Sequence, residues 1–296
     1  MVKLTIAIFG VNGYLGKPFI EALESGRFDD KFQFPVKAVT RRPTPSTSKV
    51  EYIVEPLSHE TVDSIADKLA GTDVILELLT SNSDLFEIVE KIIYKVRPKI
   101  FIPSQFGCDV AQIDTYAPGF VPEKELHSQK IRALGIKTVH VITSMWAVPG
   151  DFLYEVVGAV GIDTKTNTIV QIGDPQTRFS ITKIPDIINS VLTLVTLDIS
   201  VIPDTVRIQS DVITFQDVID RYEATHNVKL KVVKKISKEE AAKDLKQRLA
   251  HGFNHDDLFF YLQAISAQGL DKGVYFREVH NELVNPNESL WKWEKY

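Results

Sequence analysis

The chain has 296 residues, of which 44% are hydrophobic and 25% charged, a composition typical of a folded protein with a sizeable core. Its formal net charge of −5 provides no overall basic field that would attract nucleic acid or an anionic membrane surface. A single cysteine, Cys108, excludes an intramolecular disulfide, and no apolar run approaches the roughly 18 residues that a membrane helix needs. We expect a cytoplasmic protein, with nuclear entry left open, that binds neither nucleic acid nor membrane.

Short apolar runs alternate with amphipathic stretches over the first half of the chain. Strands are expected at residues 4–9, 34–40, 50–54, 73–79, 99–104 and 138–143. Helices are expected at residues 15–26, 58–71, 84–96 and 123–135, the second of them capped by Ser58. This alternation predicts an α/β fold with a doubly wound parallel (Rossmann) sheet over residues 1–150.

The pattern changes after Pro149-Gly150. Residues 168–195 read as a hairpin-like stretch and a helix, and residues 205–237 as strand, helix and strand. A further helix is expected from Ser237, which forms a capping box with Glu240. We expect residues 151–296 to form a smaller α+β lobe that binds substrate, with segments that return to the first domain.

Three glycines follow the first strand in "FGVNGYLGK", at positions 10, 13 and 16. A glycine-rich turn between a strand and a helix lets the pyrophosphate of a dinucleotide approach the helix N-terminus, where unpaired N–H groups and the helix dipole favour anions. The spacing is G-x-x-G-x-x-G and differs from the G-x-G-x-x-G of the common dehydrogenases. We interpret the turn as a pyrophosphate site.

The end of the second strand indicates which dinucleotide binds. An Asp or Glu there would bind the ribose 2′-hydroxyl of NAD(H). The strand instead ends in "VTRRP", and the guanidinium groups of Arg41 and Arg42 match the geometry of a 2′-phosphate. The sequence therefore favours NADP(H).

With these features the chain resembles the NmrA-like, isoflavone reductase-like family of atypical short-chain dehydrogenases. "GYLGK" (13–17) is similar to the family's opening fingerprint, and "IPSQFG" (102–107) resembles its Pro-Ser-Glu-Phe-Gly segment. "EKELHSQKIRALGIKT" (123–138) resembles its lysine-bearing helix, and "GDPQTRFSITKIPDI" (173–187) a later stretch. The resemblance covers roughly residues 3–190 and fades beyond.

The resemblance implies an NADPH-dependent reductase in which Lys124 binds the nicotinamide ribose and transfers a proton as general acid or base. Lys17 and Lys130 are weaker candidates, and we expect Lys130 on the outer face of its helix. The residues expected to bind the cofactor are Gly10, Asn12, Gly13, Tyr14, Leu15, Gly16, Arg41, Arg42, Leu79, Thr80, Ser104, Phe106 and Lys124. The substrate pocket is expected to contain Phe106, Met145, Trp146, Phe152 and Tyr154, which follow strand ends.

Three residues depart from the family pattern. Gln105 stands where plant members usually have glutamate, Asn12 replaces the usual threonine, and Glu77 lies inside a strand where a small residue is usual. A buried unpaired carboxylate is costly, so Glu77 is expected to reach the open end of its strand. These departures leave the substrate unidentified.

Other signals carry less weight. No tyrosine is followed by lysine four residues later, which argues against a sugar epimerase or a conventional short-chain dehydrogenase. His251 and His255 lack the glutamate of H-E-x-x-H, so no metal site is expected. "KLKVVKK" (229–235) is read as a half-exposed strand and not as a nucleic-acid stripe.

Two function classes stay open. One is an NADPH-dependent reductase of a small, aromatic or conjugated carbonyl or alkene compound. The other is a non-catalytic NADP(H)-sensing regulator of the NmrA type that binds a protein partner. The lysine at position 124 favours the enzyme, and the sequence gives no indication of the oligomeric state.

Overall fold

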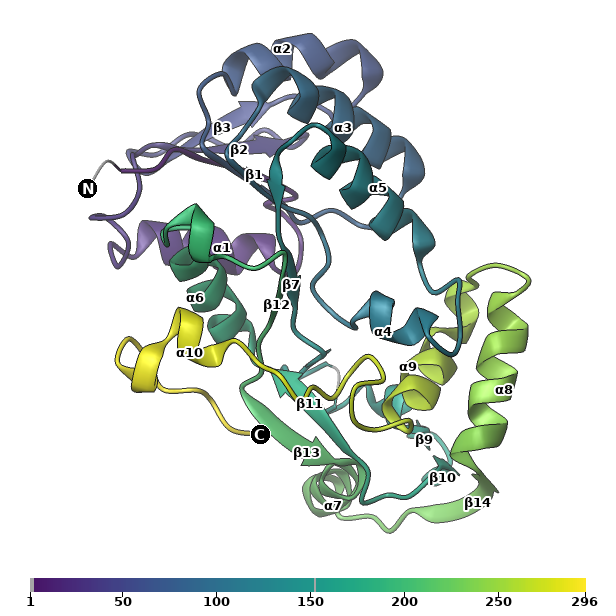
Figure 1. Cartoon of the computed structure of the whole chain (residues 1–296). Coiled ribbons are helices and arrows are strands. Elements are labelled where there is room, and N and C mark those ends of the chain that lie inside the picture. The colour runs from purple at the N-terminus through teal and green to yellow at the C-terminus, as the bar shows by residue number, and fades with distance from the viewer. Residues whose placement is uncertain (1–2, 152) are drawn as a thin grey trace. The chain divides into compact units, whose positions relative to one another are not determined.

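The computed structural model describes residues 3–151 and 153–296 (Figure 1). The chain forms two compact units. Unit 1 comprises residues 1–105, 123–141 and 188–206, and unit 2 comprises residues 106–122, 142–187 and 207–296. The units interleave along the sequence, and the domain boundary expected near residue 150 stays a prediction.

Unit 1 is built on a six-stranded sheet in the order β3-β2-β1-β4-β5-β6, with every neighbouring pair parallel. Its strands are β1 (Ile6–Phe9), β2 (Val36–Thr40), β3 (Val50–Val54), β4 (Val74–Glu77), β5 (Ile100–Ile102) and β6 (Lys137–Thr138). The order reverses between β1 and β4, which is the topological switch point of a doubly wound sheet. The predicted Rossmann fold is confirmed.

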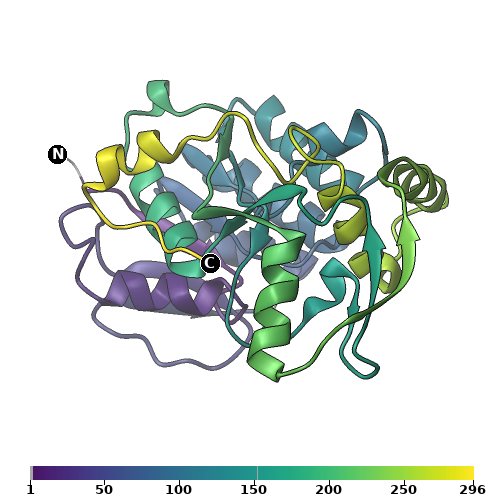
Figure 2. The ribbon, with the colours of Figure 1, turned by 90° about the horizontal axis from the view of Figure 1, so that it is seen from below.

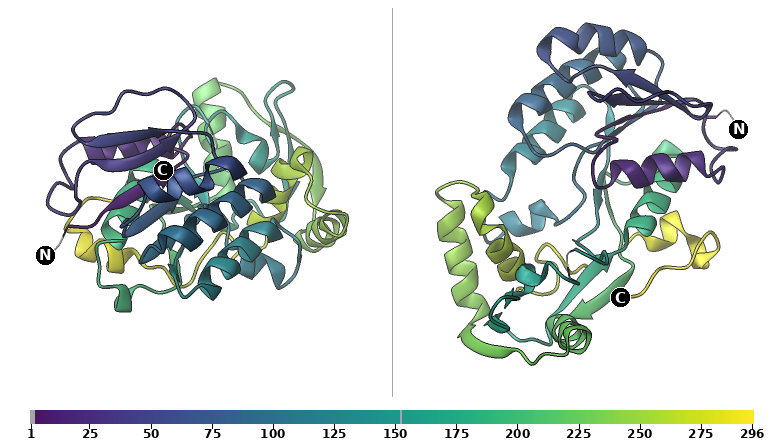
Figure 3. Two further views of the ribbon diagram at one scale, coloured as in Figure 1. Left: turned by 90° about the horizontal axis from the view of Figure 1, so that it is seen from above. Right: turned by 180° about the vertical axis from the view of Figure 1, so that it is seen from behind.

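Helices cover both faces of this sheet. They are α1 (Gly16–Glu24), α2 (Val62–Lys68), α3 (Ser83–Val96), α5 (Pro122–Ala133) and α6 (Ile184–Leu194), with the 3-10 helices η1 (His59–Thr61) and η3 (Ile199–Val201); α6 belongs to unit 1 from Ile188 onward. Figure 3 shows α2, α3 and α5 on one face of the sheet and α1 and α6 on the other. Crossover helices on both faces explain why the strands are continuous apolar runs.

The core of unit 1 follows from the apolar periodicity of its elements. In α3, Phe86, Val89 and Ile93 recur at helical spacing and are buried, and Asn82 caps the helix by accepting a hydrogen bond from the Leu85 N–H at 3.0 Å. Burying one such side chain fully stabilises the fold by about 1.5–3 kcal/mol. The helix expected at residues 58–71 is shorter, because a capping box between Ser58 and Thr61 holds a 3-10 turn before α2 begins.

The strand expected at residues 138–143 is divided in two. The Val139 N–H donates to the Phe101 carbonyl at 3.0 Å, which extends the pairing of β6 with β5. The next residue, His140, begins β7 (His140–Ile142) and donates its N–H to Asp204 at 2.9 Å, just before β12 (Thr205–Arg207). The change of hydrogen-bond partner ends the six-stranded sheet.

Unit 2 holds two three-stranded sheets. One has the order β13-β11-β8, from β8 (Met145–Trp146), β11 (Arg178–Thr182) and β13 (Asp211–Thr214). The other has the order β14-β10-β9, from β9 (Ile162–Asp163), β10 (Thr168–Ile172) and β14 (Lys231–Ile236). In both sheets antiparallel and parallel pairs occur together, as in an α+β unit.

Short and long helices complete unit 2. They are α4 (Val110–Asp114), α7 (Phe215–His226), α8 (Lys238–Leu249), α9 (Leu258–Ser266) and α10 (Asn281–Val284), with the 3-10 helices η2 (Val157–Val160), η4 (His255–Asp257) and η5 (Pro286–Glu288). Figures 1 and 2 show α7 beside β13. Ser237 caps α8 by accepting the Glu240 N–H at 3.1 Å. The short helix α4 was not predicted from the sequence, because five residues show little periodicity.

Candidate functional site

The three glycines after β1 meet different demands of the backbone. Gly10 has a φ of +84°, and a Cβ there would lie 2.3 Å from the carbonyl oxygen of Leu78. A Cβ at Gly16 would lie 2.3 Å from the carbonyl oxygen of Gly10. At Gly13 the closest atom would be the same oxygen at 3.1 Å. Gly10 and Gly16 are therefore required for the turn itself, while Gly13 has more room and lines a cavity.

The helix that follows this turn presents an uncapped N-terminus. Leu15 occupies the capping position of α1 and makes no side-chain hydrogen bond to the helix, and the first turn contains no acidic residue. The first N–H groups of a helix lack partners within the helix, and the helix dipole adds partial positive charge there. This end of α1 is thus suited to an anion.

The end of β2 is tied to the glycine turn. The Asn12 side-chain amide donates to Thr40 Oγ1 at 2.7 Å, and the Arg42 backbone N–H donates to the same oxygen at 3.1 Å. The side chains of Arg41 and Arg42 are exposed. Thr40 therefore fixes both the turn and the loop that carries the two arginines.

The glycine turn and the end of β2 border a cavity of about 410 Å³ within unit 1. It is lined by Gly10, Val11, Asn12, Gly13, Val39, Thr40, Arg41, Arg42, Glu55, Pro56, Leu57, Leu78, Leu79, Thr80 and Leu85. The lining comes from the loops after β1, β2, β3 and β4, so the cavity lies at the carboxyl ends of these strands, beside the switch point.

The cavity collects many of the predicted cofactor residues. Those that line it are Gly10, Asn12, Gly13, Arg41, Arg42, Leu79 and Thr80. Of the rest of the glycine turn, Leu15 and Gly16 are buried under the helix start and Tyr14 is exposed. Ser104 and Lys124 belong to unit 1 but do not line this cavity, and Phe106 belongs to unit 2.

One acidic residue in the cavity was missed from the sequence. Glu55 follows β3, one strand beyond the position at which an acid was looked for. It forms an ion pair with Lys68 and accepts a hydrogen bond from Ser64 Oγ at 2.8 Å. The Lys68 ammonium holds the pKa of Glu55 below its usual value despite opposing desolvation, so this carboxylate is ionised and already partnered.

Glu77 corrects a sequence-based expectation. It was expected to reach the open end of its strand, but its side chain is fully buried as the last residue of β4. It is not unpaired: Oε2 accepts the Ser104 N–H at 3.0 Å, and Oε1 lies 3.4 Å from His127 Nε2 on α5. The histidine, 50 positions away in the chain, offsets the free-energy cost of burying this carboxylate. No local sequence pattern indicates this pairing.

Lys124 lies in the first turn of α5 and is half-buried. Its carbonyl accepts a hydrogen bond from Ser128 Oγ at 3.0 Å. Glu123 and Glu125 lie at the start of α5, and Lys130 and Arg132 at its end, an arrangement that complements the helix dipole. As expected, Lys130 is exposed on the outer side.

Unit 2 has a pocket of its own, of about 180 Å³. It is lined by Phe106, Gly107, Cys108, Ser144, Met145, Trp146 and Leu262. Ser144 has a φ of +56° and donates its hydroxyl to the Val274 carbonyl at 2.8 Å, and its N–H donates to Gly107 at 2.9 Å. Three of the predicted pocket residues, Phe106, Met145 and Trp146, are therefore brought together.

The other two predicted pocket residues are not in this pocket. Tyr154 lies in a separate cluster, where its hydroxyl accepts a hydrogen bond from Lys183 Nζ at 2.5 Å and its ring is 5.4 Å from that of Tyr296. The Arg221 guanidinium lies 4.7 Å from the centre of the Tyr154 ring. Phe152 lies outside the described residues.

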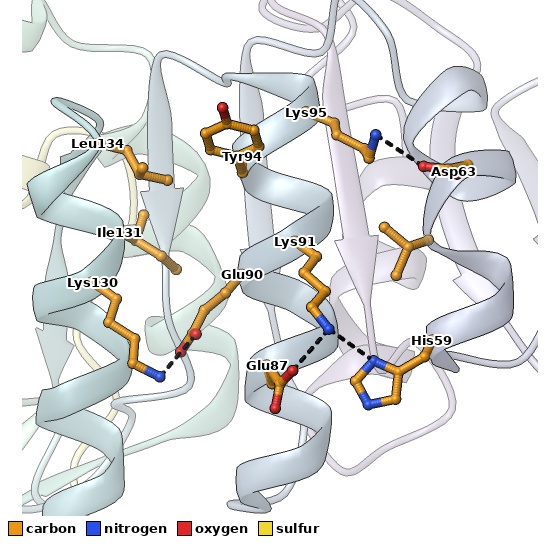
Figure 4. A pocket seen from close by; sticks show the side chains of 11 residues that line it. His59, Asp63, Glu87, Glu90, Lys91, Tyr94, Lys95, Lys130, Ile131 and Leu134 are labelled. Atoms are coloured by element: carbon orange, nitrogen blue, oxygen red, sulfur yellow. Dashed lines mark hydrogen bonds and ion pairs between the residues drawn. The ribbon is translucent and has the colours of Figure 1, made fainter.

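A groove of about 500 Å³ lies on the outer side of unit 1, among α2, α3 and α5 (Figure 4). Its floor includes Ile131 and Leu134, and its charged side chains pair with one another. Lys91 pairs with Glu87 at 2.7 Å and Lys130 with Glu90 at 3.0 Å. The sequence did not predict this groove.

Two kinds of feature are absent from residues 3–151 and 153–296. No group of three or more His, Cys, Asp or Glu side chains in these ranges could hold a metal ion. No helix in them combines the length and apolar character that crossing a membrane requires.

The fold is similar to those of several proteins of known structure. No family model and no curated protein matches the chain. The structure is similar to that of an isoflavone reductase, with a TM-score of 0.65 and 17% identity over 88% of this chain and 87% of that one. Leucoanthocyanidin reductase from Vitis vinifera in complex with NADPH gives a TM-score of 0.65 and 15% identity, over 88% and 85% of the two chains.

A nucleoside-diphosphate-sugar epimerase from Staphylococcus aureus is also similar, with a TM-score of 0.65 and 14% identity over 95% of this chain and 96% of that one. The similarity thus extends beyond the Rossmann sheet over most of each chain. At these identities it establishes the fold, and the chemistry must be argued from the residues of this chain.

Proposed function

We propose that unit 1 binds NADP(H) in its cavity and that the protein is an NADPH-dependent reductase. The observation that carries the proposal is the cavity itself, which is lined by the glycine turn and two arginines. The turn leads directly into α1, whose N-terminus has no side-chain cap. The similarity to reductase structures, one of them a complex with NADPH, supports the same assignment. We infer on this basis that the chain is a member of the NmrA-like, isoflavone reductase-like family.

The residues fit both charged groups of this cofactor. The start of α1 suits the pyrophosphate because it has no side-chain cap and no acidic residue in its first turn, and Gly13 presents bare backbone beside it. Arg41 and Arg42 suit the 2′-phosphate, since a guanidinium binds phosphate oxygens through paired hydrogen bonds. Among the described residues, Glu55 is the one acidic residue of the cavity lining that could bind the 2′-hydroxyl of NAD(H), but its carboxylate is already paired with Lys68. This combination favours NADP(H) over NAD(H).

Lys124 is proposed as the group that exchanges a proton with the substrate. Bound NADPH would supply hydride, and the product anion then needs a proton from a positioned acid. The half-buried side chain at the start of α5 is the candidate from unit 1, at the position that matches the family's lysine. Ser104, at the end of β5, would accompany it at the same edge of the sheet.

The substrate is proposed to be a small aromatic or conjugated carbonyl or alkene compound. The pocket of unit 2 is lined by the rings of Phe106 and Trp146 and the thioether of Met145, which favour a flat apolar group. One of the similar structures contains NADP+ and (+)-pinoresinol.

The test is NADPH consumption against a panel of quinones, enones and aromatic aldehydes. Lys124→Ala should lower turnover by about 10²–10⁴-fold, the usual contribution of a positioned acid. The affinity for NADPH should fall much less, because the proposed charged contacts lie elsewhere. Lys95→Ala serves as control, since Lys95 is an exposed lysine of α3 paired with Asp63.

Two results would change the proposal. Full turnover in the Lys124 variant would remove that residue from the chemistry. A parent protein that binds NADPH but consumes none with any compound would favour the alternative, an NADP(H)-sensing regulator.

A further inference from the structure

A chain of alternating charges runs through the interior of unit 1, from the end of β4 to the outer groove. Glu77 Oε1 lies 3.4 Å from His127 Nε2, and His127 Nδ1 lies 2.9 Å from Glu90 Oε1. Glu90 Oε2 in turn accepts a hydrogen bond from Lys130 Nζ at 3.0 Å, as Figure 4 shows. The side chain of Glu77 is 0% exposed and that of His127 is 1% exposed, so this chain is not a surface ion pair.

The strands β4 and β5 and the helix α3 contribute charged and aromatic contacts to His127. The β4 strand contributes Glu77, and α3 contributes Glu90 and the ring of Phe86, which stacks on the imidazole with ring centres 4.4 Å apart. From β5, Phe101 meets the imidazole edge-on at 5.7 Å. On α5 itself, Lys130 is the neighbouring charge and pairs with Glu90.

The two carboxylates beside His127 favour the charged form of its imidazole. Burial opposes the charged imidazole, but the carboxylates of Glu77 and Glu90 outweigh burial and raise the pKa of His127 above its ordinary value. Nδ1 forms a hydrogen bond with Glu90, whereas Nε2 faces Glu77 Oε1 at ion-pair distance without a hydrogen bond. Two anions around one cation leave a negative charge, which Lys130 balances at the surface.

At its inner end, this series of charged side chains is hydrogen-bonded to residues that follow β4 and β5, next to the cavity. Glu77 Oε2 accepts the Ser104 N–H at 3.0 Å, and Ser104 Oγ donates to the Leu79 carbonyl at 2.7 Å. Leu79 lines the cavity. His127 also lies three residues after Lys124 on α5, so the two share one side of the helix. A shift of Glu77 would therefore reach Ser104, Leu79 and the first turn of α5.

We propose that Glu77, His127 and Glu90 act as a charged triad that positions Ser104, Leu79 and the start of α5 for the nicotinamide half of NADP(H). The proposal rests on the proposed function of unit 1. In a doubly wound sheet the two halves of a dinucleotide lie on opposite sides of the switch point. Arg41 and Arg42 follow β2, so the adenosine half is assigned to that side and the nicotinamide half to β4 and β5. The triad residues come from β4, α3 and α5, and none of them belongs to β2 or to the loop that carries the arginines.

The experiment compares the affinities for NADPH and for 2′,5′-ADP, which lacks the nicotinamide half, in the full-length protein. Glu77→Gln and His127→Gln should weaken NADPH by about tenfold while 2′,5′-ADP changes by less than about twofold. Glu90→Gln should act in the same direction. Glu87→Gln is the matched control, because Glu87 lies one turn earlier on α3 and pairs with Lys91 outside the triad.

A pH profile adds a measurement that needs no variant. As pH rises through the raised pKa of His127, the imidazole loses its proton and the triad loses its central charge. In the parent protein the NADPH affinity should then fall relative to that of 2′,5′-ADP, and His127→Gln should remove this dependence. The imidazole signal of His127, followed by NMR, assigns the transition to this ring.

The outcomes separate the two proposals. If the parent binds neither ligand, the cofactor assignment fails and this inference falls with it. If the parent binds both, and the triad variants keep its ratio of affinities or lose both ligands equally, the positioning role is wrong while the cofactor assignment stands. If the triad variants do not fold, the parent's pH profile decides, and a ratio that does not change with pH overturns the inference.

Discussion

The cavity of unit 1 and the pocket of unit 2 differ in their lining and in how their residues follow one another along the chain. The cavity has a mixed polar and apolar lining from strand ends and the loops that follow them, and each contributes a short run of neighbours such as residues 10–13 or 39–42. The pocket is apolar and is assembled from residues 106–108, 144–146 and 262, which are distant in sequence. A site made of strand ends is visible in a sequence, because the parallel sheet brings those ends together. Phe106, Met145 and Trp146 of the pocket were predicted for the same reason, because they follow strands, whereas Leu262 lies in α9 and has no such signal.

The largest expected effect breaks the cavity at its glycine turn. Gly16→Val should prevent stable folding, since even its Cβ would lie 2.3 Å from the Gly10 carbonyl oxygen in the backbone of the turn. Gly13→Val should leave a folded protein that does not bind NADPH, because its Cβ would meet the nearest atom at 3.1 Å and the rest of the side chain would occupy the cavity. Circular dichroism and NADPH titration of both variants check the pair. Normal NADPH binding by Gly13→Val would mean that the glycines serve only the conformation of the turn and not cofactor binding.

The second effect uses pH to probe the interior of unit 1. Burial, aided by Arg132, lowers the pKa of His140 to about 3. The unfolded chain would protonate this histidine near pH 6.5 and the folded chain would not, so its contribution to stability is complete above pH 6.5 and is lost as pH falls toward 3. Between pH 7 and pH 4 this amounts to about 2–3 kcal/mol of the free energy of unfolding.

Urea titrations at both pH values should show this loss in the parent and a smaller one in His140→Leu. The comparison of the two proteins cancels His127, whose raised pKa acts in the opposite sense. An equal loss in both proteins would mean that His140 is protonated in the folded state.

The elements of unit 1 were largely predictable, because local sequence patterns mark its strands and the turns that follow them. The apolar runs at 6–9, 36–40 and 74–77 are buried strands, and the run of glycines marks the first turn. Glu77 was misjudged because its partner His127 is supplied by tertiary packing, and Glu55 was missed because it follows a different strand from the one that was inspected. Lys124 was chosen from a resemblance and Ser104 also because it follows a strand, and their roles stay predictions.

Unit 2 was predictable in its elements and much less in its contacts. Strand and helix periodicity indicated β10, β11, α7 and α8. Tyr154 was grouped with Met145 and Trp146 because all three were expected to follow strand ends, whereas its hydroxyl accepts a hydrogen bond from Lys183. That contact spans 29 residues and has no local signature.

The smallest expected effect sharpens the assignment of the unit 2 pocket. Trp146→Phe removes the hydrogen bond from the indole N–H to Thr143 Oγ1, which is 2.9 Å long, and frees space in the pocket. The KM for an aromatic substrate should change by about three- to tenfold, equivalent to about 0.7–1.4 kcal/mol, while the affinity for NADPH stays constant. Trp291→Phe, outside the pocket, is the control. A change in NADPH affinity without a change in KM would assign Trp146 to the cofactor instead.

The central claim is that the cavity of unit 1 is an NADP(H) site whose selectivity comes from Arg41 and Arg42. Fluorescence titration of the protein with NADPH and with NADH tests it most directly. We predict at least about a tenfold preference for NADPH, or about 1.4 kcal/mol, and its loss in the Arg41→Ala/Arg42→Ala double variant but not in Arg27→Ala. Arg27 is an arginine of the same unit that lies outside the cavity and bonds to Asn189. Equal affinities for the two cofactors in the parent protein would contradict the claim.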